Sequence, residues 1–231
     1  MSGGKGNLII GIDEAGRGAI AGPLVVSSFL NTKTIPFFVK DSKILSEEKR
    51  EEIFNYFLEN GYSFGIGVVS PKFIDENGIT KALRLSIELS LKFLCEDCFE
   101  LNENFFEKYE IFKNYSIYFG EKVKEESILI LIDGNSPFIE NYKTLSIIDG
   151  DNKISLISAA SIVAKVVRDE IMRKLSERYK EYEFNINKGY GTEEHFKKIL
   201  VFGCSECHRK SFIKKNLEED LNENRINTNK F

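Results

Sequence analysis

Acidic residues that directly follow apolar runs are the first feature of this sequence that could do chemistry. Asp13 and Glu14 come after the apolar residues 8–12, and Asp133 ends a second apolar run at residues 128–132. If the two runs form neighbouring parallel strands, about 4.8 Å apart, Asp13 and Asp133 lie side by side at the sheet edge where α/β proteins usually build their sites. Two close carboxylates repel each other unless a proton or a cation bridges them, and hard divalent ions such as Mg²⁺ take oxygen ligands of this kind.

A single aspartate at a strand end is more often a turn residue or a helix cap, and the repetition of the pattern is what favours a site. Asp169 is a third candidate, because it lies three residues after Val166 on the apolar face of a predicted helix. The small residues 158–161 would let this helix approach the sheet closely and bring Asp169 near the strand ends. The alternative for Asp169 is a salt-bridged acid in the core. Its neighbours Arg168 and Glu170 are expected to be surface residues.

The turn after the first acidic pair reads Gly16-Arg17-Gly18. Glycine lets the main chain come close to a ligand and adopt positive φ angles, and arginine pairs well with phosphate. Such a loop could contact a sugar hydroxyl with its main chain while Arg17 holds a phosphate. By itself, however, this short pattern is weak, because any turn can contain these residues.

The elements that must position these residues alternate along the chain. Strands are expected at residues 8–13, 23–30, 62–70, 128–133 and 144–148, and helices near 46–60, 79–101, 156–179 and 193–201. This alternation predicts a layered α/β domain with a partly parallel sheet. Residues 102–127 form a polar, acidic and irregular insertion, and residues 216–231 form a polar tail that we expect to be flexible.

Composition fits a soluble globular protein. The chain has 231 residues, of which 42% are hydrophobic and 29% charged, and its formal net charge is −4. The charge is uneven: residues 153–215 hold 14 Lys or Arg against 8 Asp or Glu, whereas residues 95–127 hold 4 against 9. The basic stretch is the part that could face a polyanion, although an ordinary solvated surface would show the same counts.

The sequence has no apolar run long enough to span a membrane and no signal-peptide core, so we expect a cytoplasmic protein.

Four cysteines form two C-x-x-C pairs, at residues 95–98 and 204–207. The pairs are about a hundred residues apart, far more than in a zinc finger, and the first lies in a predicted amphipathic helix. Cys207-His208 completes a haem-attachment string, but the predicted compartment does not suit that chemistry. We therefore expect neither zinc nor haem.

Six stretches, in order, resemble the ribonuclease HII family. They are GIDEAGRGAIAGPLVV (11–26), DSKILS (41–46), LIDGN (131–135), ISAASIVAKVVRDEIM (157–172), NKGYGTEEH (187–195) and HRKSF (208–212). The resemblance implies an RNase H-like fold, a five-stranded mixed sheet flanked by helices. Residues 1–180 would form the catalytic domain and residues 181–215 a helical part that contacts substrate. Asp149, where many relatives have lysine, and Asn187, where histidine is frequent, depart from the family pattern.

The resemblance also implies the site and the activity. Its catalytic acids and metal ligands would be Asp13, Glu14, Asp133 and Asp169, holding two divalent ions, Mg²⁺ or Mn²⁺. Substrate would be contacted by Gly16, Arg17, Gly18, Lys43 and Tyr190. The enzyme would act on nucleic acid; because the sequence itself has no clear oligomerisation signal, we expect a monomer. It would cleave the RNA strand of RNA–DNA hybrids and cut 5′ of ribonucleotides embedded in DNA, leaving 3′-hydroxyl and 5′-phosphate ends. This chemistry needs no histidine nucleophile, so we expect His195 and His208 to be structural or phosphate-contacting and not catalytic.

Two hypotheses from other classes remain at this point. One is a nucleic-acid-binding module without chemistry, which would keep the basic stretch but would not need four acids. The other is a protein-interaction domain in which the acids are helix caps and the cysteines bind structural zinc. Metal content and cleavage of a ribonucleotide-containing duplex separate the three.

Overall fold

The structure is a computed structural model that describes residues 8–39, 45–92, 115–119, 128–134 and 142–214. Its centre is one mixed sheet with the strand order β4-β3-β2-β1-β5-β6. The strands β1 to β4 pair in antiparallel fashion, while β5 runs parallel to β1 and β6 parallel to β5. The strands are β1 (Leu8–Ala15), β2 (Leu24–Leu30), β3 (Phe64–Val69), β4 (Tyr115–Phe119), β5 (Ile128–Asp133) and β6 (Lys143–Ile147).

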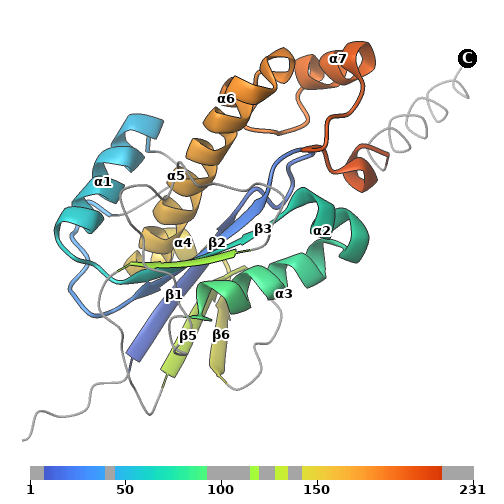
Figure 1. Cartoon of the computed structure of the whole chain (residues 1–231). Helices are drawn as coiled ribbons and strands as arrows, with labels where there is room; N and C mark the ends of the chain where they lie inside the picture. Colours follow the sequence, from blue (N-terminus) through green and yellow to red (C-terminus); the bar gives the residue numbers. More distant parts are fainter. Residues whose placement is uncertain (1–7, 40–44, 93–114, 120–127, 135–141, 215–231) are drawn as a thin grey trace, which may run out of the picture.

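Helices cover both faces of the sheet (Figure 1). Helices α1 and α5 lie on one face, α2 and α3 lie on the other, and α6 and α7 extend beyond one end of the sheet (Figure 1). The helices are α1 (Glu47–Glu59), α2 (Pro71–Asn77), α3 (Ile79–Ser90), α4 (Gly150–Lys153), α5 (Ser155–Arg178), the 3-10 helix η2 (Lys180–Tyr182), α6 (Phe184–Asn187) and α7 (Glu193–Phe202). Among the described residues, no helix is long and apolar enough to cross a membrane.

The strands at the centre of the sheet are buried on both faces, which explains their continuous apolar runs. In β1, Ile10 and Ile12 are buried in the hydrophobic cluster on the α3 side. Alternation of side chains along a strand then places Asp13 on the opposite face, under α5. The strand does not end at Asp13, as the sequence predicts, but continues to Ala15, because Asp13 and Glu14 still pair with Ser27 and Val26 of β2.

Helix α5 approaches the sheet closely, as the small residues 158–161 predict. A Cβ atom on Gly11 of β1 would lie only 2.5 Å from the Leu156 carbonyl carbon of α5. All four residues 158–161 are buried. This close contact fixes where α5 side chains meet the C-terminal end of β1.

The predicted five-stranded mixed sheet and its flanking helices are confirmed, and a sixth strand is added. Strand β4 comes from the segment 102–127, which the sequence suggests is irregular, and it pairs with the edge strand β3. The predicted long helix at 156–179 is α5, almost residue for residue.

Candidate active site

Asp13 and Asp133 lie next to each other at one edge of the sheet. Ile12 pairs with Ile132 in the parallel register of β1 and β5, so the two aspartates follow on neighbouring strands. Asp13 is 6% exposed. The pKa of Asp13 is raised to about 7, chiefly by burial and also by the negative charges of Glu14 and Asp133. Hydrogen bonds from the Ser161 side chain and the Glu14 amide oppose this shift. The environment of Asp13 therefore disfavours the charged form of its carboxyl group.

Glu14 belongs to the same group of charges. Burial raises the pKa of Glu14, the nearby guanidinium of Arg17 lowers it, and the charge of Asp133 raises it again. The Arg17 Nη1 atom lies 3.3 Å from the Glu14 Oε1 atom. The structure thus brings three of the four predicted acids together.

A tight turn after β6 holds Asp133. The Gly150 amide, the first of α4, donates a hydrogen bond of 2.6 Å to Asp133 Oδ1. A Cβ atom on Gly150 would lie 2.7 Å from Ile157 Cδ1 and 3.2 Å from the same Asp133 oxygen, so any other residue there would force Ile157 and this carboxylate to shift. The turn enters α4 through Asp149, whose φ is +54°. The main chain at Gly150 therefore contacts the Asp133 carboxylate directly.

Asp151, the next residue of α4, is a further acid that the sequence analysis missed. It is 2% exposed and directly follows the glycine that binds Asp133. A signal for it does exist in the sequence. The strand β6 runs parallel to β5, so its C-terminal end lies at the same edge, and Asp149 and Asp151 follow it much as Asp13 and Asp133 lie at the ends of their apolar runs.

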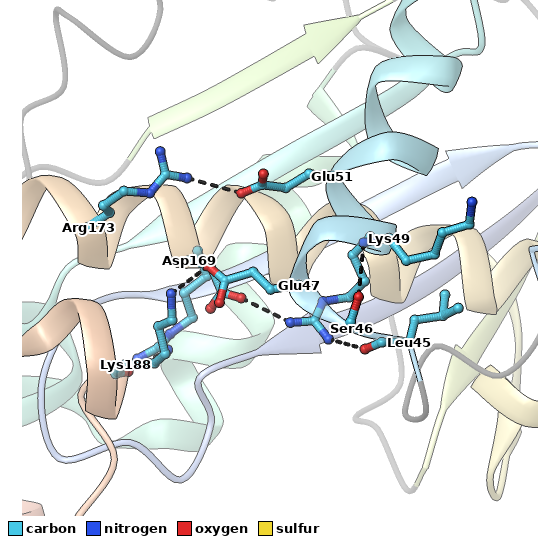
Figure 2. A network of polar contacts seen from close by, with 10 residues as sticks. Leu45, Ser46, Glu47, Lys49, Glu51, Asp169, Arg173 and Lys188 are labelled. Carbon is cyan, nitrogen blue, oxygen red and sulfur yellow. Dashed lines mark hydrogen bonds and ion pairs between the residues drawn. The ribbon is translucent and has the colours of Figure 1, made fainter.

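Asp169 is not brought to this group. Asp13 meets α5 at Ser161, and Asp169 lies eight residues further along the helix, roughly 12 Å at 1.5 Å per residue. There its Oδ2 atom lies 3.3 Å from Arg50 Nη2 of α1. Figure 2 shows Asp169 among the polar side chains where α1 begins. Burial raises the pKa of Asp169, while Lys188, rather than the other predicted acids, makes the largest charge contribution. The prediction that Asp169 joins the cluster is therefore corrected: it belongs to the contact between α1 and α5.

Protein donors, and not a preformed metal geometry, orient the carboxyl groups of the described cluster. In the part of the chain that the structure describes, no group of three or more His, Cys, Asp or Glu side chains is arranged to hold a metal ion. Each carboxyl group is instead oriented by protein donors: Asp13 by Ser161, Glu14 by Arg17 and Asp133 by Gly150. The donor set still fits a hard divalent cation, because it consists of clustered carboxylate oxygens. A bound cation would also stabilise the charged form of Asp13, which burial and the neighbouring carboxylates disfavour.

Of the predicted substrate-contacting residues, Arg17 lies directly beside the acidic cluster, at 3.3 Å from Glu14. Gly16 adopts a φ of +86°, as expected for a tight loop, and Arg17 and Gly18 are exposed. Tyr190 is 45% exposed, and its ring lies 5.3 Å from the Arg168 guanidinium carbon. Lys43 lies outside the described residues.

The cysteines and histidines are separate from the acids. Cys204 and Cys207 are free, and Cys95 and Cys98 lie outside the described residues. His195 and His208 are both buried, with their Nε2 atoms 3.1 Å apart.

Comparisons with known proteins identify the family of this chain. The sequence model of the family described as Ribonuclease HII matches residues 10–215. The Ribonuclease HII of Pelagibacter ubique is 37% identical over 207 residues, which cover 89% of this chain and 95% of that protein. The crystal structure of the ribonuclease H2 from Pyrococcus horikoshii OT3 has the same fold, with a TM-score of 0.64 and 24% identity over 92% of this chain and 98% of that one. Bst-RNase HIII in complex with Mn²⁺ also shares the fold, with a TM-score of 0.60 and 17% identity over 88% of this chain and 66% of that one. The chain therefore belongs to the ribonuclease HII family and is an endoribonuclease.

Proposed function

We propose that this endoribonuclease requires a divalent metal and cuts on the 5′ side of ribonucleotides, both in RNA–DNA hybrids and where single ribonucleotides are embedded in duplex DNA. The products carry 3′-hydroxyl and 5′-phosphate ends. The observation that carries the proposal is the adjacency of Asp13 and Asp133 at the ends of parallel strands, with the pKa of Asp13 raised to about 7. Such a cluster has little use in a protein that only binds nucleic acid.

The metal would be held by Asp13, Glu14 and Asp133. Two ions, Mg²⁺ or Mn²⁺, would supply an activated water as nucleophile and stabilise the charge on the phosphate and on the leaving 3′-oxygen. The chain's own contribution is to fix the carboxylates. The Gly150 amide holds Asp133, and Ser161 holds Asp13, so the acids are oriented by main chain and helix contacts before substrate arrives.

Asp151 is the better candidate for the fourth acid. Its carboxyl group is buried one residue from the amide that binds Asp133, whereas Asp169 is paired with Arg50 at the contact between α1 and α5. We therefore assign the fourth metal-binding position to Asp151 and a structural role to Asp169.

Substrate would lie across the loop formed by the buried Gly16 and the exposed Arg17 and Gly18. It would also contact the ring of Tyr190, and Lys43 would contact a phosphate. The C-terminal residues 181–215 supply Tyr190 and part of the basic stretch. In this proposal the enzyme acts as a cytoplasmic monomer on nucleic acid alone.

The test is cleavage of two labelled duplexes, one with a single embedded ribonucleotide and one entirely of DNA, with Mg²⁺, with Mn²⁺ and with EDTA. We expect a single cut 5′ of the ribonucleotide, only with metal, and a product that a ligase and a phosphatase identify as 3′-hydroxyl and 5′-phosphate. Binding without cutting in either metal would favour the nucleic-acid-binding module. Tightly held zinc in the purified protein would favour the interaction domain.

A further inference from the structure

Two arginines are buried beneath the loop that would contact substrate. Arg168 of α5 is 1% exposed and Arg209, after α7, is 0% exposed. Arg168 was expected on the surface from its place beside Asp169, and this expectation is wrong. Both guanidinium groups donate to main-chain carbonyl oxygens, and most of these belong to residues 16–23.

Arg209 holds the two ends of this loop. Its Nη1 atom donates to the carbonyl oxygens of Gly16 at 2.8 Å and Arg17 at 3.3 Å, and its Nε atom donates to that of Gly22 at 2.9 Å. The Arg209 amide also donates to the Ile20 carbonyl oxygen at 2.7 Å. One residue from the C-terminal part thus contacts the loop at four places.

Arg168 holds the loop from the side of α5. Its Nε atom donates to the carbonyl oxygen of Pro23 and its Nη2 atom to that of Ala21, each at 3.1 Å. Gly16 packs directly on this side chain, because a Cβ atom there would lie 1.9 Å from Arg168 Nε. Arg168 therefore leaves no room for a side chain at Gly16, and the positive φ of this residue is a second reason for glycine.

The same arginine connects the loop to Tyr190. Its Nη1 atom donates to the carbonyl oxygen of Lys188 at 2.8 Å, and its guanidinium lies under the Tyr190 ring. The amides of Ile20 and Ala21 both donate to the Gly189 carbonyl oxygen, at 2.9 and 3.0 Å. Segments around residues 16–23, 188–190 and 207–209, far apart in the sequence, are thereby joined into one unit.

This arrangement is costly for stability. Burial and the like charge of Arg168 both lower the pKa of Arg209. The Nη2 atom of Arg209 is buried and has no hydrogen-bond partner among the described residues. Replacing buried charged groups by apolar side chains is often neutral or stabilising in proteins, so a role in packing alone does not explain two adjacent buried guanidinium groups.

The carbonyl contacts determine which way the loop amides point. In a trans peptide the N–H and C=O bonds point in opposite directions. Because Arg209 draws the oxygens of Gly16 and Arg17 inward, the amides of Arg17 and Gly18 are turned to the outer side, where both residues are exposed. Adjacent outward amides form a concave donor site for an electronegative group such as a ribose hydroxyl or phosphate oxygen.

We propose that Arg168 and Arg209 are positioning residues: they fix the loop at residues 16–18 and Tyr190 in the geometry that distinguishes a ribonucleotide from a deoxyribonucleotide. This inference rests on the proposed function, because the loop must contact substrate. Neither arginine needs to touch the substrate itself.

The test uses Arg209→Met, which keeps the length of the side chain but removes all its donors, and Arg209→Lys, which keeps the charge but cannot reach the loop carbonyls together. Arg84→Met, at an exposed position of α3, is the matched control. Each full-length protein is measured in EDTA for its affinity to a duplex with one ribonucleotide and to the all-DNA duplex of the same sequence. Hydrogen exchange of residues 15–23 is followed by mass spectrometry.

We expect Arg209→Met to reduce the preference for the ribonucleotide duplex by about tenfold, roughly the loss of one or two well-placed hydrogen bonds. Affinity for the all-DNA duplex should change little, whereas a variant that is merely unstable would lose affinity for both duplexes. Exchange of residues 15–23 should become faster, while α5 stays protected. Arg209→Lys should fall between wild type and Arg209→Met, and Arg84→Met should match wild type.

A wild-type preference and wild-type exchange in both Arg209 variants would overturn the proposal. If Arg209→Met does not fold, Arg209→Lys decides alone by the same two measurements. Failure of the proposed function would look different, because the wild-type protein itself would then show no preference for the ribonucleotide. The exchange measurement needs no activity and still tests whether the arginines fix the loop.

Discussion

The Asp169 carboxylate lies 3.3 Å from the Arg50 guanidinium, where helix α1 packs against α5. Arg50 also donates to the Leu45 carbonyl oxygen at 2.7 Å, just before α1 begins. Two further ion pairs lie beside it in Figure 2, Glu51 with Arg173 and Glu47 with Lys188. An acid on an apolar helix face is explained here by a partner on the neighbouring helix.

This assignment predicts opposite behaviour for two aspartates that look alike in the sequence. Asp151→Asn should fold like the wild type and lose roughly 100-fold or more of its Mg²⁺-dependent cleavage, because it removes a charge from the metal-binding group. Asp169→Asn should keep most of its cleavage and lose about 1–3 kcal/mol of stability, because Arg50 loses its charged partner. Steady-state cleavage and urea unfolding measure the two effects.

Asp133→Asn serves as the control for a metal-binding acid and should resemble Asp151→Asn. The assignment would be contradicted by full cleavage in Asp151→Asn, or by an Asp169→Asn variant that melts like the wild type but does not cut.

The pair Asp13 and Asp133 could be predicted from the sequence, because two apolar runs that each lead to an acid predict buried parallel strands, and their register places the acids together. Asp169 could not be placed in the same way. Helical periodicity gives the face on which a side chain lies but not its height along the axis, and the roughly 12 Å between Ser161 and Asp169 decides its partner.

The burial of Arg168 and Arg209 could not be predicted from the sequence, for a related reason. Arg168 and Arg209 are partnered by carbonyl oxygens, which every residue has. The farthest of these partners lie 147 positions from Arg168 and 193 positions from Arg209. A sequence shows the guanidinium group but does not show which main-chain oxygens will surround it. Only the folded packing of the three segments reveals this.

The raised pKa of Asp13 predicts a stability change with pH in the metal-free protein. In the unfolded chain Asp13 titrates near 3.8, and in the folded protein near 7. Between these values the folded state keeps a proton that the unfolded chain has released, so this group lowers the free energy of unfolding as pH rises from about 4 to about 7. Asp13→Asn, which carries no charge, should therefore become more stable than the wild type at pH 8, by at most about 4 kcal/mol.

Thermal melts of both proteins at pH 5 and pH 8 in EDTA measure this difference, which should be less than half as large at pH 5 as at pH 8. Adding Mg²⁺ at pH 8 should raise the melting temperature of the wild type and leave Asp13→Asn nearly unchanged. A constant difference between the two proteins at both pH values would show that Asp13 does not titrate in this range.

Tyr190 should contribute to substrate binding through its ring. The side chain is 45% exposed and rests on Arg168, so removing it uncovers little of the core. Tyr190→Ala should weaken binding of the ribonucleotide duplex by about 1–3 kcal/mol, the usual range for an aromatic stack, with little loss of stability. Tyr190→Phe keeps the ring and should retain most of the affinity; equal affinity in all three proteins would show that the ring only packs on Arg168.

The buried histidine pair predicts a loss of stability in acid. His195 Nδ1 lies 2.8 Å from the Tyr190 carbonyl oxygen and must donate to it, so its Nε2 atom accepts the proton of His208 Nε2 at 3.1 Å. The Ser205 amide donates to His208 Nδ1 at 2.9 Å, which leaves no place for a second proton. Burial, with the neighbouring His195, lowers the pKa of His208 to about 4.

Because the unfolded chain binds a proton near pH 6.5 and the folded chain only near pH 4, the free energy of unfolding falls as pH decreases between these values. The charges near the pair include Lys198, which also disfavours protonation of His195. His208→Gln keeps a donor and an acceptor but cannot titrate, so its stability should change less than that of the wild type between pH 7 and pH 4.5. Urea unfolding at several pH values gives the comparison, and parallel curves for the two proteins would show that the acid sensitivity arises elsewhere.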